Sequence, residues 1–222
     1  MIELLVTIAI IGIVTTAVLF GSGALVNSRM RGAASMISGA VRIAYTRASA
    51  TSRTNRLAFD FEAGTVALEE TSDAMLVQKE DATGGSEASS AEERAAIDLA
   101  SRVIKGPQAP RARFSAVKAL GFDDPDTSGG RTIGKGVKFR KIETDHLPDG
   151  QTSGKAYLYF WPGGQTERAA IQLVPAGADG PDDGMTLLVA PLTGRTKTAP
   201  GAKSMDPLRD DGTSSEREDR AF

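Results

Sequence analysis

The chain has 222 residues, with 26 basic and 28 acidic side chains and no cysteine. That length can bury a hydrophobic core, the near balance of charge gives no global sign of a nucleic-acid partner, and the lack of cysteine excludes disulfides and thiol chemistry. The charges are unevenly spread, because residues 27–59 hold six arginines and no acid, whereas residues 60–100 hold eleven acids and two bases.

The N-terminus is the most apolar part of the chain. Leu4 to Val26 gives 23 residues without a charge, and a helix of that length, at about 1.5 Å per residue, crosses a hydrocarbon core of roughly 30 Å. A cleaved signal peptide is the competing interpretation, but it would have a basic start and a shorter apolar segment. We therefore predict a transmembrane helix over residues 1–26.

Glu3 is the unusual residue of this segment. A carboxylate at the end of an apolar helix is costly in lipid unless it is paired or reaches the interface. The plainer interpretation is an acid in the headgroup layer, favourably placed near a helix N-terminus.

The first residues, Ile2-Glu3-Leu4-Leu5-Val6 followed by an apolar run, closely resemble the N-terminal motif of type IV pilins and pseudopilins. The resemblance implies that Glu3 neutralises the N-terminal amine of a neighbouring subunit during assembly, as a salt bridge within a filament. It also implies that Ile2, Leu4, Leu5 and Val6 pack in the membrane helix. Opposite charges repay each other's desolvation far better in lipid than in water.

The start of the chain departs from that motif. The basic leader, the cleavage-site glycine, the N-methylated phenylalanine and the threonine are missing, and Met1 stands where the family has leucine. We expect either a native chain that is a few residues longer and is processed before assembly, or a chain that prepilin peptidase cannot cut.

Apolar residues continue beyond the membrane segment at three- and four-residue steps, which predicts an amphipathic helix over residues 27–56. The stripe consists of Met30, Ala33, Ala34, Ile37, Val41, Ala44, Tyr45 and Ala48. It indicates a domain wrapped on one face of a long helix, which also resembles the architecture of pilins.

A β-rich head is predicted over residues 57–198. It begins with a hairpin, in which Leu57, Phe59 and Phe61 alternate with polar or small residues before a turn at Gly64 and a return strand through Leu68. A loop and short helix form an insertion over residues 71–110. We expect residues 71–90 to be flexible, and Ser90 with Glu93 to form a capping box for a helix over 91–104.

Five further strands are predicted. They lie at Phe114–Ala119, Val137–Ile142, Ala156–Trp161, Ala169–Val174 and Met185–Ala190. The third is apolar on both faces, as expected of a central strand buried on both sides. We expect residues 199–222 to be a disordered polar tail.

The C-terminal third carries a second resemblance. Phe160-Trp161-Pro162-Gly163-Gly164, then a strand, then Leu192-Thr193-Gly194-Arg195 is similar to the F-x-P-x-G … T-G-R ending of the GspH/FimT family of minor pseudopilins and minor pilins. The two resemblances cover roughly residues 1–70 and 135–198. The resemblance implies that Phe160, Pro162, Gly164, Thr193, Gly194 and Arg195 form the family's turns in the head.

No constellation of residues indicates catalysis, so we expect no catalytic site, no cofactor and no enzyme activity. His146 is the only histidine and lies in a polar turn, where a histidine is usually solvated. Asp179, Asp182 and Asp183 form a weak calcium candidate in a Gly/Pro loop, against the alternative of an ordinary acidic turn.

The predicted fold class is α+β, with a long N-terminal helix, membrane-spanning in its first half, packed on an antiparallel β-sheet or β-sandwich head. By resemblance, the leading function is a minor pseudopilin at or near the tip of a type II secretion pseudopilus in the inner membrane, with its head in the periplasm. Its partners would be other minor pseudopilins, the major subunit, the assembly platform and the secreted substrate.

Three alternatives to this function remain open: a minor pilin of a type IV pilus, a DNA-binding minor pilin for DNA uptake, and an anchored periplasmic enzyme. A nucleic-acid partner would use Arg195 and Lys197, and a pair of charges provides little affinity for phosphates. The sequence offers no residues in support of the enzyme.

Overall fold

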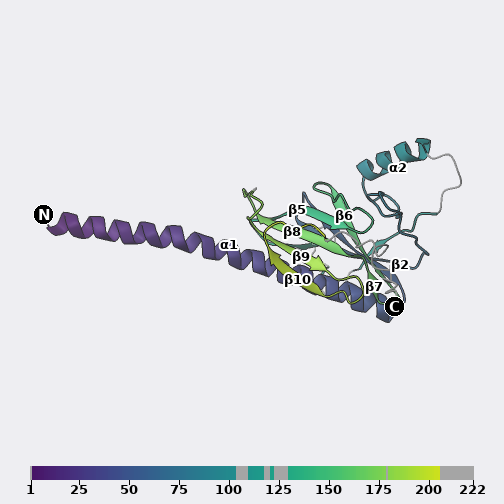
Figure 1. The fold of residues 1–222 in the computed structure, drawn as a ribbon, viewed down its shortest axis with the longest axis horizontal. Helices are drawn as coiled ribbons and strands as arrows, with labels where there is room; N and C mark the ends of the chain where they lie inside the picture. The colour runs from purple at the N-terminus through teal and green to yellow at the C-terminus, as the bar shows by residue number, and fades with distance from the viewer. Residues whose placement is uncertain (1, 104–109, 118–120, 123–129, 179, 206–222) are drawn as a thin grey trace, which may run out of the picture.

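The computed structural model describes residues 2–103, 110–117, 121–122, 130–178 and 180–205, apart from the side chains of Leu5 and of residues 13–25. One helix, α1 (Ile2–Thr51), runs without a break through the N-terminal part of the chain. Its second half lies along the head, and its first half extends away from it (Figure 1).

The predicted membrane span over residues 1–26 coincides with the extended half of α1. Within this span, the side chains of residues 13–25 lie outside the described part. Among the described residues, no helix combines the length and the apolar character that crossing a membrane would require.

The described strands form two antiparallel sheets. One has the order β3-β2-β1-β6-β7, with β4 also paired to β2, and the other has the order β10-β9-β8-β5. The strands of the first sheet are β1 (Thr54–Asp60), β2 (Thr65–Thr71), β3 (Ser115–Ala116), β4 (Arg131–Thr132), β6 (Lys155–Trp161) and β7 (Gln165–Thr166). Those of the second are β5 (Val137–Thr144), β8 (Ala169–Pro175), β9 (Met185–Val189) and β10 (Thr196–Pro200). The fold is therefore α+β, with a helix packed on antiparallel sheets, as the sequence predicts.

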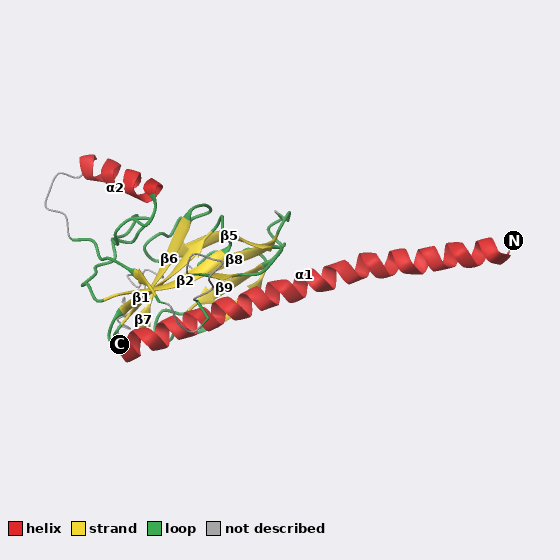
Figure 2. Cartoon of the chain, turned by 180° about the vertical axis from the view of Figure 1, so that it is seen from behind, coloured by secondary structure: helices red, strands yellow, loops and turns green. Residues whose placement is uncertain are grey.

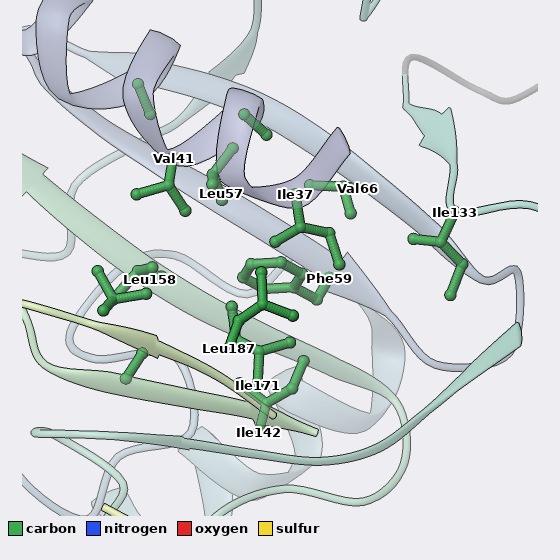
Figure 3. Close-up of a cluster of buried hydrophobic side chains, with 14 of the residues drawn as sticks. Ile37, Val41, Leu57, Phe59, Val66, Ile133, Ile142, Leu158, Ile171 and Leu187 are labelled. Atoms are coloured by element: carbon green, nitrogen blue, oxygen red, sulfur yellow. The ribbon is translucent and has the colours of Figure 1, made fainter. Parts of the chain in front are cut away.

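The main core lies between α1 and both sheets. Ile37 and Val41 of α1 point toward Phe59 of β1, which in turn faces the second sheet (Figure 3). The predicted stripe on α1 is confirmed, since each of its residues is buried except Tyr45, which is half-buried. The predicted hairpin is confirmed too, with Leu57 opposite Leu68 and Phe59 opposite Val66.

Strand β6 is buried on both faces, as its sequence predicts. Leu158 and Phe160 face the main core, while Tyr157 and Tyr159 face a second, smaller cluster that includes Phe114. In this second cluster, Met75 and Val77 of the inserted loop pack on the outer face of the first sheet.

The insertion is more ordered than its composition predicts. Residues 83–86 are buried, and the loop closes on itself through hydrogen bonds such as the one from Gln78 N to Gly84 O (3.3 Å). The expectation of a flexible loop over 71–90 is therefore wrong, because the segment packs on the sheet. Helix α2 (Ala91–Val103) follows and stands away from the sheets (Figure 2).

The capping box of α2 is confirmed. Glu93 N donates to Ser90 Oγ (3.2 Å), and Ser90 N donates to a carboxylate oxygen of Glu93 (3.2 Å). The other carboxylate oxygen of Glu93 accepts a hydrogen bond from the Tyr157 hydroxyl (2.8 Å), so this cap also attaches the helix to β6.

The folded part of the chain extends beyond Thr198. Strand β10 continues to Pro200 and pairs with β9. After it, Thr186 Oγ1 accepts a hydrogen bond from Lys203 N (2.9 Å), and the buried Glu143 accepts one from Met205 N (2.8 Å). The disorder predicted from residue 199 onward is thus wrong for residues 199–205, and residues 206–222 lie outside the described part.

Candidate functional site

The first described turns of α1 expose large apolar side chains. Exposed fractions range from 52% at Val6 to 79% at Ile2, and the set consists of Ile2, Leu4, Val6, Ile8, Ile10 and Ile11. At 100° per residue these positions lie on all sides of the helix, which is typical of a helix that is surrounded by an apolar environment. Contiguous exposed apolar surface of this kind marks an interaction site.

Glu3 lies within this apolar surface. Its side chain is exposed, and no cation among the described residues pairs with it. Its backbone carbonyl accepts a hydrogen bond from Thr7 Oγ1 (2.9 Å), which satisfies the hydroxyl within the helix. Of the four side chains predicted to pack in the membrane helix, Ile2, Leu4 and Val6 are exposed, and that of Leu5 lies outside the description.

At the other end of α1, Tyr45 connects the two predicted motif turns. Its hydroxyl donates to the carbonyl of Gly164 (2.8 Å) and also lies 3.2 Å from the carbonyl of Leu192. Gly194 packs flat against the Tyr45 ring, where an added Cβ would lie 2.7 Å from Cδ2. The structure thus brings residues 160–164 and 192–195 together around one side chain of the helix.

Both motif glycines have backbone conformations that L-residues rarely adopt. The φ angle is +74° at Gly164 and +58° at Gly194. Phe160 is buried in the core, whereas Pro162, Thr193 and Arg195 are exposed. The motif residues therefore divide into those that attach the head to α1 and those that remain on its surface.

A groove of about 670 Å³ runs between α1 and the second motif turn, lined by Arg42, Tyr45, Thr193 and Arg195 among others. Arg42 and Arg195 are both exposed. Lys197, the other predicted nucleic-acid residue, is exposed on β10.

The calcium candidate is only partly described. Asp179 lies outside the described residues, Asp182 is exposed, and the carboxylate of Asp183 accepts a hydrogen bond from Gly180 N (3.0 Å) within its own turn. Among the residues that the structure describes, no three carboxylate or histidine side chains gather as a metal site would require.

His146 differs from its sequence-based expectation of a solvated side chain. It is 2% exposed, and its Nδ1 lies 2.7 Å from Glu167 Oε1. The other oxygen of that carboxylate accepts a hydrogen bond from Tyr159 N (3.2 Å). The turn folds back onto the sheet, and a single sequence gives no signal for such a long-range pairing.

Arg56 is a second buried polar residue that the sequence did not indicate. Its guanidinium lies 4.1 Å from the ring centres of both Phe114 and Tyr157 and forms an ion pair with Glu69 (2.6 Å). Burial opposes its charge, but Glu69 and the neighbouring tyrosines outweigh that effect and raise the pKa of Arg56. The cluster attaches the inserted loop to the first sheet.

Comparison with known proteins adds little to this geometry. No protein-family model matches the sequence, and no curated protein matches it either. A solved structure to which the chain is similar is that of the minor pseudopilin EpsH from the type 2 secretion system of Vibrio cholerae, at 10% identity and a TM-score of 0.44. The similarity covers 80% of this chain and 99% of that one.

Proposed function

We propose that the chain is a subunit of a type IV pilin-like filament, and within that class a minor pseudopilin of a type II secretion system. The observation that carries the proposal is the division of α1 into two halves. In the half that begins with the pilin-like Ile2-Glu3-Leu4-Leu5-Val6, the described large apolar side chains are exposed, and the other half is buried against a β-rich head.

Such a division suits a subunit whose apolar helix is buried outside its own fold. In the proposal, the N-terminal half of α1 anchors the chain in the inner membrane and then packs against the helices of neighbouring subunits, with the head in the periplasm. The partners are the other minor pseudopilins, the major subunit and the assembly platform. The role is structural rather than catalytic, and it requires no cofactor.

The assignment to the minor subunits is supported by the C-terminal turns. The segments that resemble the GspH/FimT ending meet at Tyr45, so in this chain they serve a shared structural purpose. Deletion of the gene should abolish release of folded proteins into the medium while leaving surface pili intact. Loss of pili with normal secretion would assign the chain to a pilus instead.

Glu3 provides the direct test of filament membership. An unpaired carboxylate in lipid is costly, and pairing with an amine of a neighbouring subunit repays that cost only in the assembled state. Glu3→Leu should therefore leave the amount of membrane-bound protein unchanged and lower cross-linking to neighbouring subunits several-fold.

The chain lacks cysteine, so single cysteines can be placed as cross-linking sites without background. Glu62→Leu, which removes an exposed carboxylate from the β1–β2 turn, is the matched control. Equal cross-linking yields for Glu3→Leu and the unmodified chain would mean that Glu3 is only an interfacial residue.

A further inference from the structure

One end of the head carries a group of exposed cations, which we call the basic collar: Arg29, Arg31, Lys135 and Lys138. This end is the one from which α1 extends toward its N-terminus (Figure 1). The two segments meet there, because a Cβ added at Gly136 would lie 3.5 Å from a guanidinium nitrogen of Arg29.

The outward direction of these cations follows from what their neighbours bury. Met30, between the two arginines, is 2% exposed and packs into the core. On β5, Val137 and Phe139 face the core, so Lys138 between them faces solvent by the alternation of a strand. Three of the four cations thus lie on α1 or β5, and Lys135 lies in the turn that leads into β5.

Two of the described acids lie in the turn beside the collar. The β8–β9 turn contributes the exposed Asp182 and Asp183, and the carboxylate of Asp183 accepts a hydrogen bond from Gly180 N. Ala176 N donates to Gly136 O (2.9 Å), which places this turn beside the collar. The four cations of the collar therefore outnumber the two exposed acids described in this turn.

The position of the collar along α1 points to its partner. Arg29 lies three residues beyond Val26, the last residue of the uncharged run, which is about 4.5 Å along an unbroken helix. Cations at that distance from an apolar helix lie at the level of lipid headgroups, where an anionic surface attracts them. We propose that the basic collar seats the head on the anionic headgroups of the bilayer in which the N-terminal half of α1 is anchored.

This proposal rests on the membrane-anchoring part of the proposed function, and it is tested on the whole chain in vesicles, without any filament partner. A fluorescent donor is attached at Ala176→Cys, in the exposed turn beside the collar, and an acceptor is placed on the lipid headgroups. A donor at Ala50→Cys, exposed near the other end of α1, reports the far end of the head. Flotation of the same samples reports anchoring separately.

Energy transfer from position 176 should be higher in vesicles with phosphatidylglycerol than in vesicles of phosphatidylcholine alone, and raised salt should remove the difference. Lys135→Gln with Lys138→Gln should lower the ratio of seated to unseated heads on the order of tenfold or more, since each cation near an anionic surface favours binding about fivefold. Position 50 should respond little to lipid charge.

The matched control is Lys79→Gln with Lys197→Gln, which removes the same charge from exposed positions elsewhere on the head. Transfer that is insensitive to lipid charge, or that falls equally in the control pair, would overturn the collar while flotation keeps the anchor intact. A chain that floats with neither type of vesicle would overturn the anchor and the collar together. Filament membership is decided independently by the Glu3 cross-linking.

Discussion

Tyr45 shows how much of the head depends on one side chain of α1. Its hydroxyl serves the carbonyls of Gly164 and Leu192, and its ring lies against Gly194. These contacts join the helix to turns that follow it by more than a hundred residues. The positive φ angle and the contact distance at Gly194 leave no room for a side chain.

Gly194→Ala should therefore lower the free energy of unfolding by about 2–4 kcal/mol, through a disfavoured φ angle and overpacking against Tyr45. Gly163→Ala is the matched control, because nothing lies within 4 Å of an added Cβ there and φ is not positive. That control should change stability by less than about 0.5 kcal/mol. Denaturant unfolding measures both, and equal effects would contradict the packing described at Gly194.

The sequence predicted part of this arrangement. Tyr45 falls on the apolar stripe and the glycines fall in recognisable turns, so burial of the helix face and the presence of turns were both predictable. The hydrogen bonds of the hydroxyl were not, since its partners lie 119 and 147 residues away. Arg56 and His146 were missed for the same reason, because local polarity favours exposure and only tertiary contacts override it.

Among the elements, the inserted loop contains a partly buried polar cluster centred on the carboxylate of Asp81. The Asp81 carboxylate forms an ion pair with Arg111 (2.8 Å) and accepts hydrogen bonds from Thr83 N (2.9 Å) and Thr83 Oγ1 (2.8 Å). Burial opposes its ionisation, yet the hydrogen bonds from Thr83 and the charge of Arg111 prevail and lower the pKa of Asp81 below its ordinary value of 3.8.

A carboxyl group whose pKa is lower in the folded state stabilises the fold above its unfolded pKa, and that contribution disappears as pH falls through the folded pKa. The free energy of unfolding should thus be higher for the unmodified chain than for Asp81→Asn at pH 6, with the two converging below pH 3.8. Denaturant unfolding at stepped pH measures this. Asp149→Asn, at an exposed position, is the matched control and should change the free energy of unfolding at pH 6 by less than about 0.5 kcal/mol. A pH-independent difference for Asp81→Asn would contradict the assignment.

Helices and strands were predicted correctly where the signal lies within a short stretch of sequence. The hairpin, strand β6 and the cap of α2 have alternation, a continuous apolar run or a spaced Ser–Glu pair, and all are present. Strand β10, with the sequence Thr196–Pro200, has one buried residue, Ala199, so its pattern does not differ from that of a tail. Its existence depends on pairing with β9, which a single sequence does not reveal.

For the whole molecule, the head should fold without the extended half of α1. A shortened chain that begins at Ser28 retains the helix stripe from Met30 to Ala48 and everything that covers it. It should be soluble, with circular dichroism showing mainly β-structure plus one helix, because its apolar surface is already buried. A chain that begins at Val26, which is partly buried against the core, is the matched comparison and should be slightly more stable. Aggregation, or a mainly helical spectrum, would contradict this architecture.

Because α1 is unbroken, it also fixes the orientation of the head about the helix axis. Over the helix from Ile2 to Thr51, each residue advances the chain by about 100° around the axis, and no turn or strand interrupts it. The direction in which the sheets face therefore has a fixed angular relation to the direction in which Glu3 points. If one half of α1 rotates about the helix axis, the other half rotates with it, over a helix about 75 Å long. In such a subunit, each orientation of the apolar half about the helix axis corresponds to one orientation of the head. The molecules that bind the apolar half therefore determine which side of the head is exposed to the surroundings.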